Sequence, residues 1–310
     1  MSRPHSMFAW CVFALLASPA LAQQEPDTTF DTRVARPALV ERAPRMLFDE
    51  GHHEFHRTAG RYRPFADLAR HDGWRVTANT AQIDSAALAA ADLLVIANAL
   101  GDERMDRPEA SEPAFTPAEV GAIERWVRGG GALLLIADHA PMGDAARSLG
   151  EAFGVDMRAA YTADPDRAEG GNETFLHFRS GHGLADEHPI VLGRDSTESV
   201  HHVLAFTGQS LAGPPGSVAL LRLSDRAEDL LVGLGRAGGR VPADKRRAAA
   251  GRAQALAFEH GRGRVVVMGE AAMLTAQVAG GRRVPMGMNV PGNDDRQFAL
   301  NTLRWLARAL

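Results

Sequence analysis

Residues 132–137 read Ala-Leu-Leu-Leu-Ile-Ala and form the most apolar strand pattern of the sequence. The run lacks the alternation of a half-exposed strand, so both faces of the strand should be buried, as in the middle of a parallel sheet. Three glycines at 129–131 end a helix pattern that begins with the capping box Thr116-Pro117-Ala118-Glu119. A helix that leads into a doubly buried strand predicts an α/β fold.

The alternation of strand and helix patterns extends along most of the chain. We expect further strands at 45–48, 74–78, 92–97 and 264–268, and helices at 62–71, 84–90, 116–128, 144–153 and 295–310. A helix start is also expected at 271–278. The pattern loosens at about 155–255, where short strand-like runs occur at 174–178, 200–206 and 218–223. The sequence therefore predicts a single α/β domain over 45–310, elaborated at about 155–255.

The first 22 residues have the pattern of a secretory signal peptide. Arg3 and His5 precede an apolar run at 8–17, and Ala20-Leu21-Ala22 offers a cleavage site. The run is too short to span a bilayer, and the alternative is an N-terminal core helix. We expect export to the periplasm or the extracellular space, a mature chain without a membrane span, and a polar, proline-containing flexible leader at 23–44.

Cleavage of the signal peptide changes the cysteine count and the net charge, and with them the functions that the composition permits. It removes Cys11, the only cysteine, so the mature chain can form neither a disulfide nor a cysteine nucleophile. It leaves 33 basic against 38 acidic residues, a formal charge of −5, which gives no charge excess for binding nucleic acid. Residues 236–252 are basic and alanine-rich; we interpret them as a solvated loop or helix face, with an anion-binding patch as the alternative.

Polar residues follow several expected strands, at the sheet edge where α/β proteins bind ligands. Asn98 follows the strand at 92–97, Asp138 and His139 follow the central strand, and Glu270 follows the strand at 264–268. His139 is a candidate general base that Asp138 or Glu270 would orient, which makes these three the candidate catalytic residues. The alternative is that Asp138 caps a turn while His139 packs as a neutral ring. Asn98 is a candidate ligand-binding residue.

A second group of candidates follows the first expected strand. Asp49, His52 and His56 are candidate metal ligands, since two histidines four residues apart share one face of a helix. A divalent metal held there would activate water for hydrolysis. The alternative is that these histidines bond the backbone of a polar loop or cap the following helix.

The polar loop at 287–294 precedes the last expected helix. Asn289 and Asn293 are candidate ligand-binding residues if this loop lines the strand-end cleft. The alternative is that Asn293, Asp294 or Asp295 supplies the N-cap of the helix.

Several motifs occur together in a characteristic order. These are the segments 48–52, 94–98, 130–139, 263–277 and 296–306. Over roughly 45–310 the chain resembles the bacterial domain of unknown function 4350, within the class I glutamine-amidotransferase-like superfamily. The resemblance implies a flavodoxin-like three-layer sandwich with a mostly parallel sheet.

The glutaminase branch of that superfamily carries a cysteine after a central strand. The matching position here lies in Ala137-Asp138-His139-Ala140, so a cysteine glutaminase is excluded. Two functions remain: a hydrolase-like site in a polar strand-end cleft, and a non-catalytic module that binds a small polar ligand, such as a sugar or a peptide fragment, or a protein partner. The first predicts that His139, Glu270 and one of the candidate metal ligands lie within about 6 Å of one another.

Overall fold

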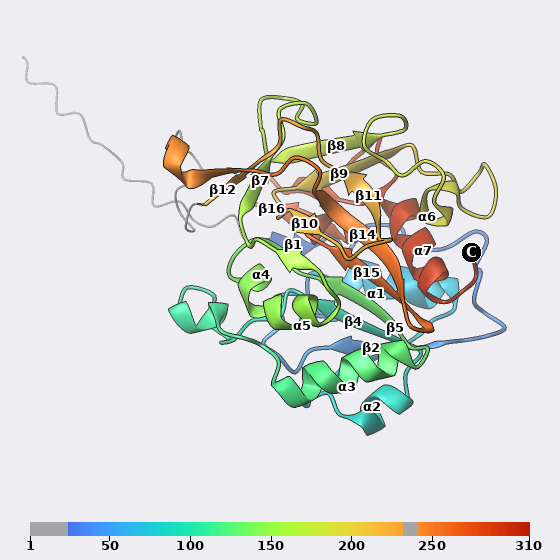
Figure 1. Ribbon diagram of the computed structural model, residues 1–310. Helices are drawn as coiled ribbons and strands as arrows, with labels where there is room; N and C mark the ends of the chain where they lie inside the picture. The colour runs from blue at the N-terminus through green and yellow to red at the C-terminus, as the bar shows by residue number, and fades with distance from the viewer. Residues whose placement is uncertain (1–23, 232–240) are drawn as a thin grey trace, which may run out of the picture.

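The computed structural model describes residues 24–231 and 241–310 (Figure 1). The expected signal peptide at 1–22 and residues 236–240 of the basic segment lie outside the described residues. No helix within the described ranges is long and apolar enough to cross a membrane.

Five parallel strands form one half of the central sheet. Their order across the sheet is β3-β2-β4-β5-β15. The strands are β2 (Arg45–Asp49), β3 (Arg75–Asn79), β4 (Leu93–Ala97), β5 (Ala132–Ile136) and β15 (Gly263–Met268). β5 lies between β4 and β15, and all five of its residues are buried, as its apolar sequence predicts. The predicted α/β class with a mostly parallel sheet is confirmed.

Helices cover both faces of this sheet and make the three layers (Figure 1). They are α1 (Arg63–Asp72), α2 (Ser85–Ala89), α3 (Pro117–Arg128), α4 (Met142–Ala145), α5 (Arg147–Ala152), α6 (Pro189–Leu192) and α7 (Asp295–Leu306). Leu134 and Ile136 of β5 belong to the core shared with α1 and α7. Leu133 and Leu135 belong to the core shared with α2, α3 and α5. Alternate side chains of one strand thus serve two separate apolar cores.

The capping box predicted at the start of α3 is present. The Thr116 hydroxyl accepts a hydrogen bond from the Glu119 backbone at 3.3 Å, and the Glu119 carboxylate accepts one from the Thr116 backbone at 2.9 Å. Both bonds satisfy N–H groups that the first turn of a helix leaves without intrahelical partners.

Antiparallel strands extend the central sheet beyond β15. β14 (Ala253–His260) pairs with β15, and β6 (Asp156–Met157), β10 (Leu211–Ala212) and β11 (Val218–Arg222) complete this half. Two small sheets form from β7 (Tyr161–Ala163), β12 (Glu228–Leu230) and β13 (Arg246–Ala248), and from β8 (Phe175–Arg179) and β9 (His202–Phe206). The region at about 155–255 therefore builds onto the main sheet, partly by continuing it.

Two expectations about local structure are wrong. Residues 271–278 form a short 3-10 helix, η3 (Ala272–Leu274), followed by strand β16 (Ala276–Ala279). β16 pairs with β17 (Val284–Gly287) on one side and with β1 (Gln24–Pro26) on the other, so contacts distant in sequence determine its conformation. The expected flexible leader is also ordered, because β1 lies in this sheet and Leu39 is fully buried.

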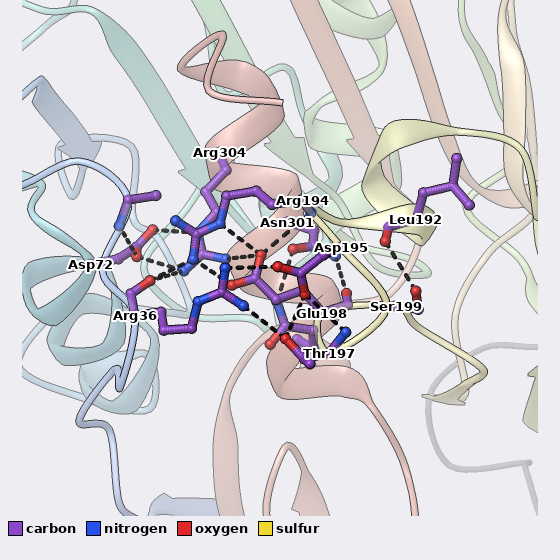
Figure 2. A network of polar contacts seen from close by, with 12 residues as sticks. Arg36, Asp72, Leu192, Arg194, Asp195, Thr197, Glu198, Ser199, Asn301 and Arg304 are labelled. Atoms are coloured by element: carbon purple, nitrogen blue, oxygen red, sulfur yellow. Dashed lines mark hydrogen bonds and ion pairs between the residues drawn. The ribbon is translucent and has the colours of Figure 1, made fainter.

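A buried ion pair fixes the second half of the leader against the helical layer (Figure 2). Arg304 of α7 makes two hydrogen bonds, of 2.8 and 2.9 Å, to the carboxylate of Asp72 at the end of α1. The same carboxylate accepts the backbone N–H of Ala38, and Arg304 also bonds the carbonyl of Arg36. Prolines in the leader therefore do not prevent order, because the backbone of this segment is bonded to charged core side chains.

The expected basic segment is split between different roles. Arg246 and Arg247 lie in β13, whereas Arg252 is buried and pairs with Asp156 at 2.6 Å. Arg252 thus holds part of the antiparallel half together and is not part of a solvated face.

Candidate functional site

A pocket of about 560 Å³ opens at the carboxyl ends of β4, β5 and β15. Its lining includes five of the predicted site residues: His56, Asn98, Asp138, His139 and Glu270. Gln24, Arg61, Tyr161 and Gln277, which sequence reasoning did not single out, also line it. Polar residues at the carboxyl ends of the strands therefore lie together in one pocket, which we call the strand-end pocket.

Sheet register explains why two carboxyl side chains meet in this pocket. Ile136 of β5 lies opposite Met268 of β15, so Asp138 and Glu270 each stand two residues beyond a paired position. Asn98 contributes from the next strand by accepting the Asp138 backbone N–H at 2.9 Å. Because the three strands are parallel, their polar ends are brought to one level.

The Glu270 carboxylate is anchored at the start of η3. One oxygen accepts the backbone N–H of Ala272 at 2.6 Å, and the other accepts that of Met273 at 2.9 Å. Burial, together with the nearby charge of Asp138, nevertheless raises the pKa of Glu270 well above its usual range. Burial also raises the pKa of Asp138 to about 8. This buried pair therefore retains a proton at neutral pH.

His139 is held as a neutral ring beside this pair. Its Nδ1 lies 2.8 Å from the carbonyl of Ala140, which can only accept, so Nδ1 carries the proton and Nε2 is free to accept one. The ring stacks on Tyr161 with 4.1 Å between centroids. Burial lowers the pKa of His139 below its usual value. The Nε2 atom is 3.8 Å from an Asp138 carboxylate oxygen.

Two further side chains bring unsatisfied polar atoms to the pocket. Gln277 is fully buried, and neither its amide oxygen nor its amide nitrogen has a hydrogen-bond partner among the described residues. His56 is 3% exposed, packs at a tilt against the ring of Tyr62 and has no described partner for Nδ1. Burial lowers the pKa of His56 to about 3. Buried polar groups without partners are costly, which favours a polar ligand in this pocket.

The predicted metal set of Asp49, His52 and His56 is not brought together. Residues 50–62 contain no helix, so the spacing of four residues does not place the two histidines on one face. Asp49 and His52 instead cluster with Glu54, while His56 turns to the strand-end pocket. Burial, and then the neighbouring Asp49, raises the pKa of Glu54 to about 10. His56 therefore does not lie with Asp49 and His52, and metal binding by these residues stays a prediction.

The two asparagines of the loop at 287–294 have structural contacts. Asn289 donates to the carboxylate of Asp27 and the carbonyl of Gln277, at 2.9 and 2.8 Å. Asn293 donates to the carbonyl of Gly287 and accepts the backbone N–H of Asp295. Neither residue is in the lining of the strand-end pocket, so the ligand-binding prediction for them is replaced by a role in holding this loop.

Gln277 and Tyr161, two pocket residues that we did not predict, lie in segments whose local sequence pattern does not identify them. Gln277 lies in the segment expected to be helical, and it enters the pocket because β16 pairs with β1. Tyr161 belongs to a three-residue strand, β7, too short to show a period.

A comparison with solved structures supports the fold. The chain matches a protein described as the mmIFT52 N-terminal domain with a TM-score of 0.57 and 13% identity, over 85% of this chain and 97% of that one. A ThuA-like protein from Bacteroides uniformis matches with a TM-score of 0.47 and 13% identity, over 84% and 90% of the two chains. A GMP synthase subunit from Thermoplasma acidophilum gives a TM-score of 0.41 and 12% identity, over 86% and 95%.

At 13% identity, the match to the mmIFT52 N-terminal domain supports the fold alone. A scan against protein-family models found no match, and neither did a search of curated proteins. Membership of domain of unknown function 4350 stays a prediction from the sequence motifs.

Proposed function

We propose that the strand-end pocket hydrolyses a small polar substrate, with water as nucleophile, His139 as general base and Asp138 as general acid. The observation that carries the proposal is the placement of Asp138 and Glu270 at matching positions of adjacent strands, beside His139, in one pocket. The expected mature chain has no thiol, which agrees with a mechanism that needs no cysteine.

The protonation of these groups suits that division of roles. His139 has a lowered pKa and offers an unprotonated Nε2, whereas Asp138, with a pKa of about 8, still carries a proton at neutral pH. Water attacks the electrophilic carbon and gives a proton to Nε2 while the carboxyl of Asp138 protonates the leaving group. Return of the proton from His139 to Asp138 completes the cycle, and one water is consumed for each bond broken.

Variants at these residues test the mechanism on a panel of small esters, amides and glycosides. Asp138→Asn and His139→Asn should each lower kcat/KM by about 100-fold or more, the usual range for one acid or base. Asp102→Asn and His53→Asn change the same residue types outside the strand-end pocket and should leave kcat/KM unchanged. The pH profile should fall below the lowered pKa of His139 and again above about 8. Hydrolysis that survives both pocket substitutions would refute the assignment.

A second candidate function is binding without chemistry. The unpartnered amide of Gln277 and the unpartnered nitrogen of His56 favour it, because a ligand can satisfy both without being cleaved. Thermal-shift screening with sugars, short peptides and other small polar compounds separates the two functions. A compound that stabilises the protein and is recovered intact supports the binding module.

We also propose export, supported by the basic, apolar and small-residue pattern of residues 1–22. β1 begins at Gln24, so cleavage after Ala22 would remove no described element. The mass of the N-terminal peptide from secreted or periplasmic protein tests this proposal. Uncleaved protein in the cytoplasm would contradict it.

A further inference from the structure

A second cluster of polar side chains lies beneath the loop that follows β2. Asp49, His52 and Glu54 each offer one ligand atom, and these atoms all lie within 4.8 Å of one another. Nδ1 of His52 is 2.6 Å from the carboxylate of Asp49 and 3.9 Å from Oε1 of Glu54. All three side chains are buried, and the cluster stands independently of the proposed hydrolysis.

The capping-box glutamate of α3 fixes the orientation of this histidine. Oε1 of Glu119 is 2.9 Å from Nε2 of His52 and also accepts the backbone N–H of Ile83. Oε2 accepts both the backbone N–H and the hydroxyl of Thr116. Carboxylates therefore lie at hydrogen-bond distance from both ring nitrogens, Asp49 at Nδ1 and Glu119 at Nε2. A metal ion would displace the proton at Nδ1, while Glu119 would keep the proton on Nε2. Metal-binding histidines are held in this way by a carboxylate at the other ring nitrogen.

Glu54 adds a further oxygen ligand to the cluster. Oε1 of Glu54 is buried and has no hydrogen-bond partner among the described residues. Within residues 24–231 and 241–310, no arginine or lysine forms an ion pair with Asp49, Glu54 or Glu119. Three carboxyl groups thus surround one imidazole, and a divalent ion would displace the protons that these groups share in the absence of metal.

We propose that Asp49, His52 and Glu54 bind one divalent transition-metal ion, with Glu119 as the positioning residue for His52. One imidazole nitrogen with two carboxylates suits Zn²⁺ better than Mg²⁺, which prefers oxygen ligands throughout. Glu54 and the neighbouring His53 are also in the lining of an adjacent pocket of about 480 Å³.

The ion would stiffen the loop that forms one wall of the strand-end pocket. The backbone N–H of Phe55, the residue after Glu54, donates to the carbonyl of Asn98 at 2.9 Å, and the carbonyl of His52 accepts the N–H of Leu100. Phe55 and Asn98 both line the strand-end pocket. The metal is therefore structural in this proposal, and it takes no part in the proton transfers between His139 and Asp138.

Equilibrium dialysis against ZnCl₂ followed by elemental analysis tests the site. Wild-type protein should retain about one equivalent of zinc that His52→Asn and Glu54→Gln each lose. His53→Asn is the matched control, because it removes the adjacent, exposed histidine at a left-handed position that asparagine tolerates. The His53→Asn variant should retain the one equivalent of zinc. Glu119→Gln should weaken zinc binding by about 10- to 100-fold, as is usual for residues that orient a ligand.

Circular dichroism confirms that each variant is folded, and Co²⁺ titration of the wild type provides a measurement that needs no variant. Visible absorption bands that appear with Co²⁺ and disappear on adding one equivalent of Zn²⁺ support the site. MgCl₂ at the same concentration should leave those bands unchanged. Zinc that remains bound in both His52→Asn and Glu54→Gln, or no zinc bound by the wild type, overturns the proposal. Neither result bears on hydrolysis, which the variants at Asp138 and His139 test separately.

Discussion

Replacement of Arg304 by methionine should destabilise the fold strongly. Arg304 and Asp72 form an ion pair (Figure 2), and their side chains are 1% and 0% exposed. After the change, the Asp72 carboxylate keeps only the hydrogen bond from the backbone N–H of Ala38 among the described residues. Removing one partner of a buried pair leaves an uncompensated charge and costs about 3–5 kcal/mol, a large part of the typical 5–15 kcal/mol of a whole domain.

Urea unfolding followed by circular dichroism measures this cost. Arg36→Ala is the control, since Arg36 pairs with Asp195 in the same network but both side chains are about half exposed. Its unfolding midpoint should stay close to that of the wild type, because solvent screens exposed pairs. The double change Asp72→Asn with Arg304→Met should recover much of the loss, because no buried charge is left unpaired. Equal losses for Arg304→Met and Arg36→Ala would refute the reasoning.

Three further predictions concern single side chains. Asp138 has a pKa of about 8 in the fold and an ordinary value of 3.8, so the native state holds a proton that the unfolded chain has released. Wild-type stability relative to Asp138→Asn should therefore fall as pH rises from 5 to 8, by at most about 4 kcal/mol in urea unfolding, and a constant difference would contradict it. Gln277→Leu should raise the melting temperature, because it removes two unpartnered buried atoms, and a lower value would show that they have partners. Thr116→Ala should lower the free energy of unfolding by about 1 kcal/mol, because it breaks the capping box. Thr116→Ser, which keeps the hydroxyl, should retain most of this stability and is the control.

Local patterns predicted the parallel half of the fold well. β5 and α3 were readable because a doubly buried strand and a capping box each depend on a few consecutive residues. β16 was mistaken for a helix because its apolar residues resemble a helix start, whereas its pairing with β1 joins residues about 250 positions apart. The secondary-structure propensity of a short segment carries no information about contacts between residues so far apart in the sequence.

The candidate site was predictable where its residues directly follow the predicted parallel strands. Asn98, Asp138 and Glu270 follow parallel strands directly, so the fold alone brings them together. His56 was placed with the wrong neighbours because a spacing of four residues gives a shared face only in a helix, and the chain forms an irregular loop there. Glu54 and Glu119 were not recognised as partners of His52, since a capping residue gives no sign of a second contact across the fold.

The pairing of β1 with β16 also determines when the strand-end pocket can exist. Gln24 of β1 and Met286 of β17 both line it, so its wall needs the first and the last of the described strands. A chain still being synthesised lacks the second of these strands. Any activity that depends on the pocket therefore begins only in the finished molecule, and the unfinished chain carries none of it.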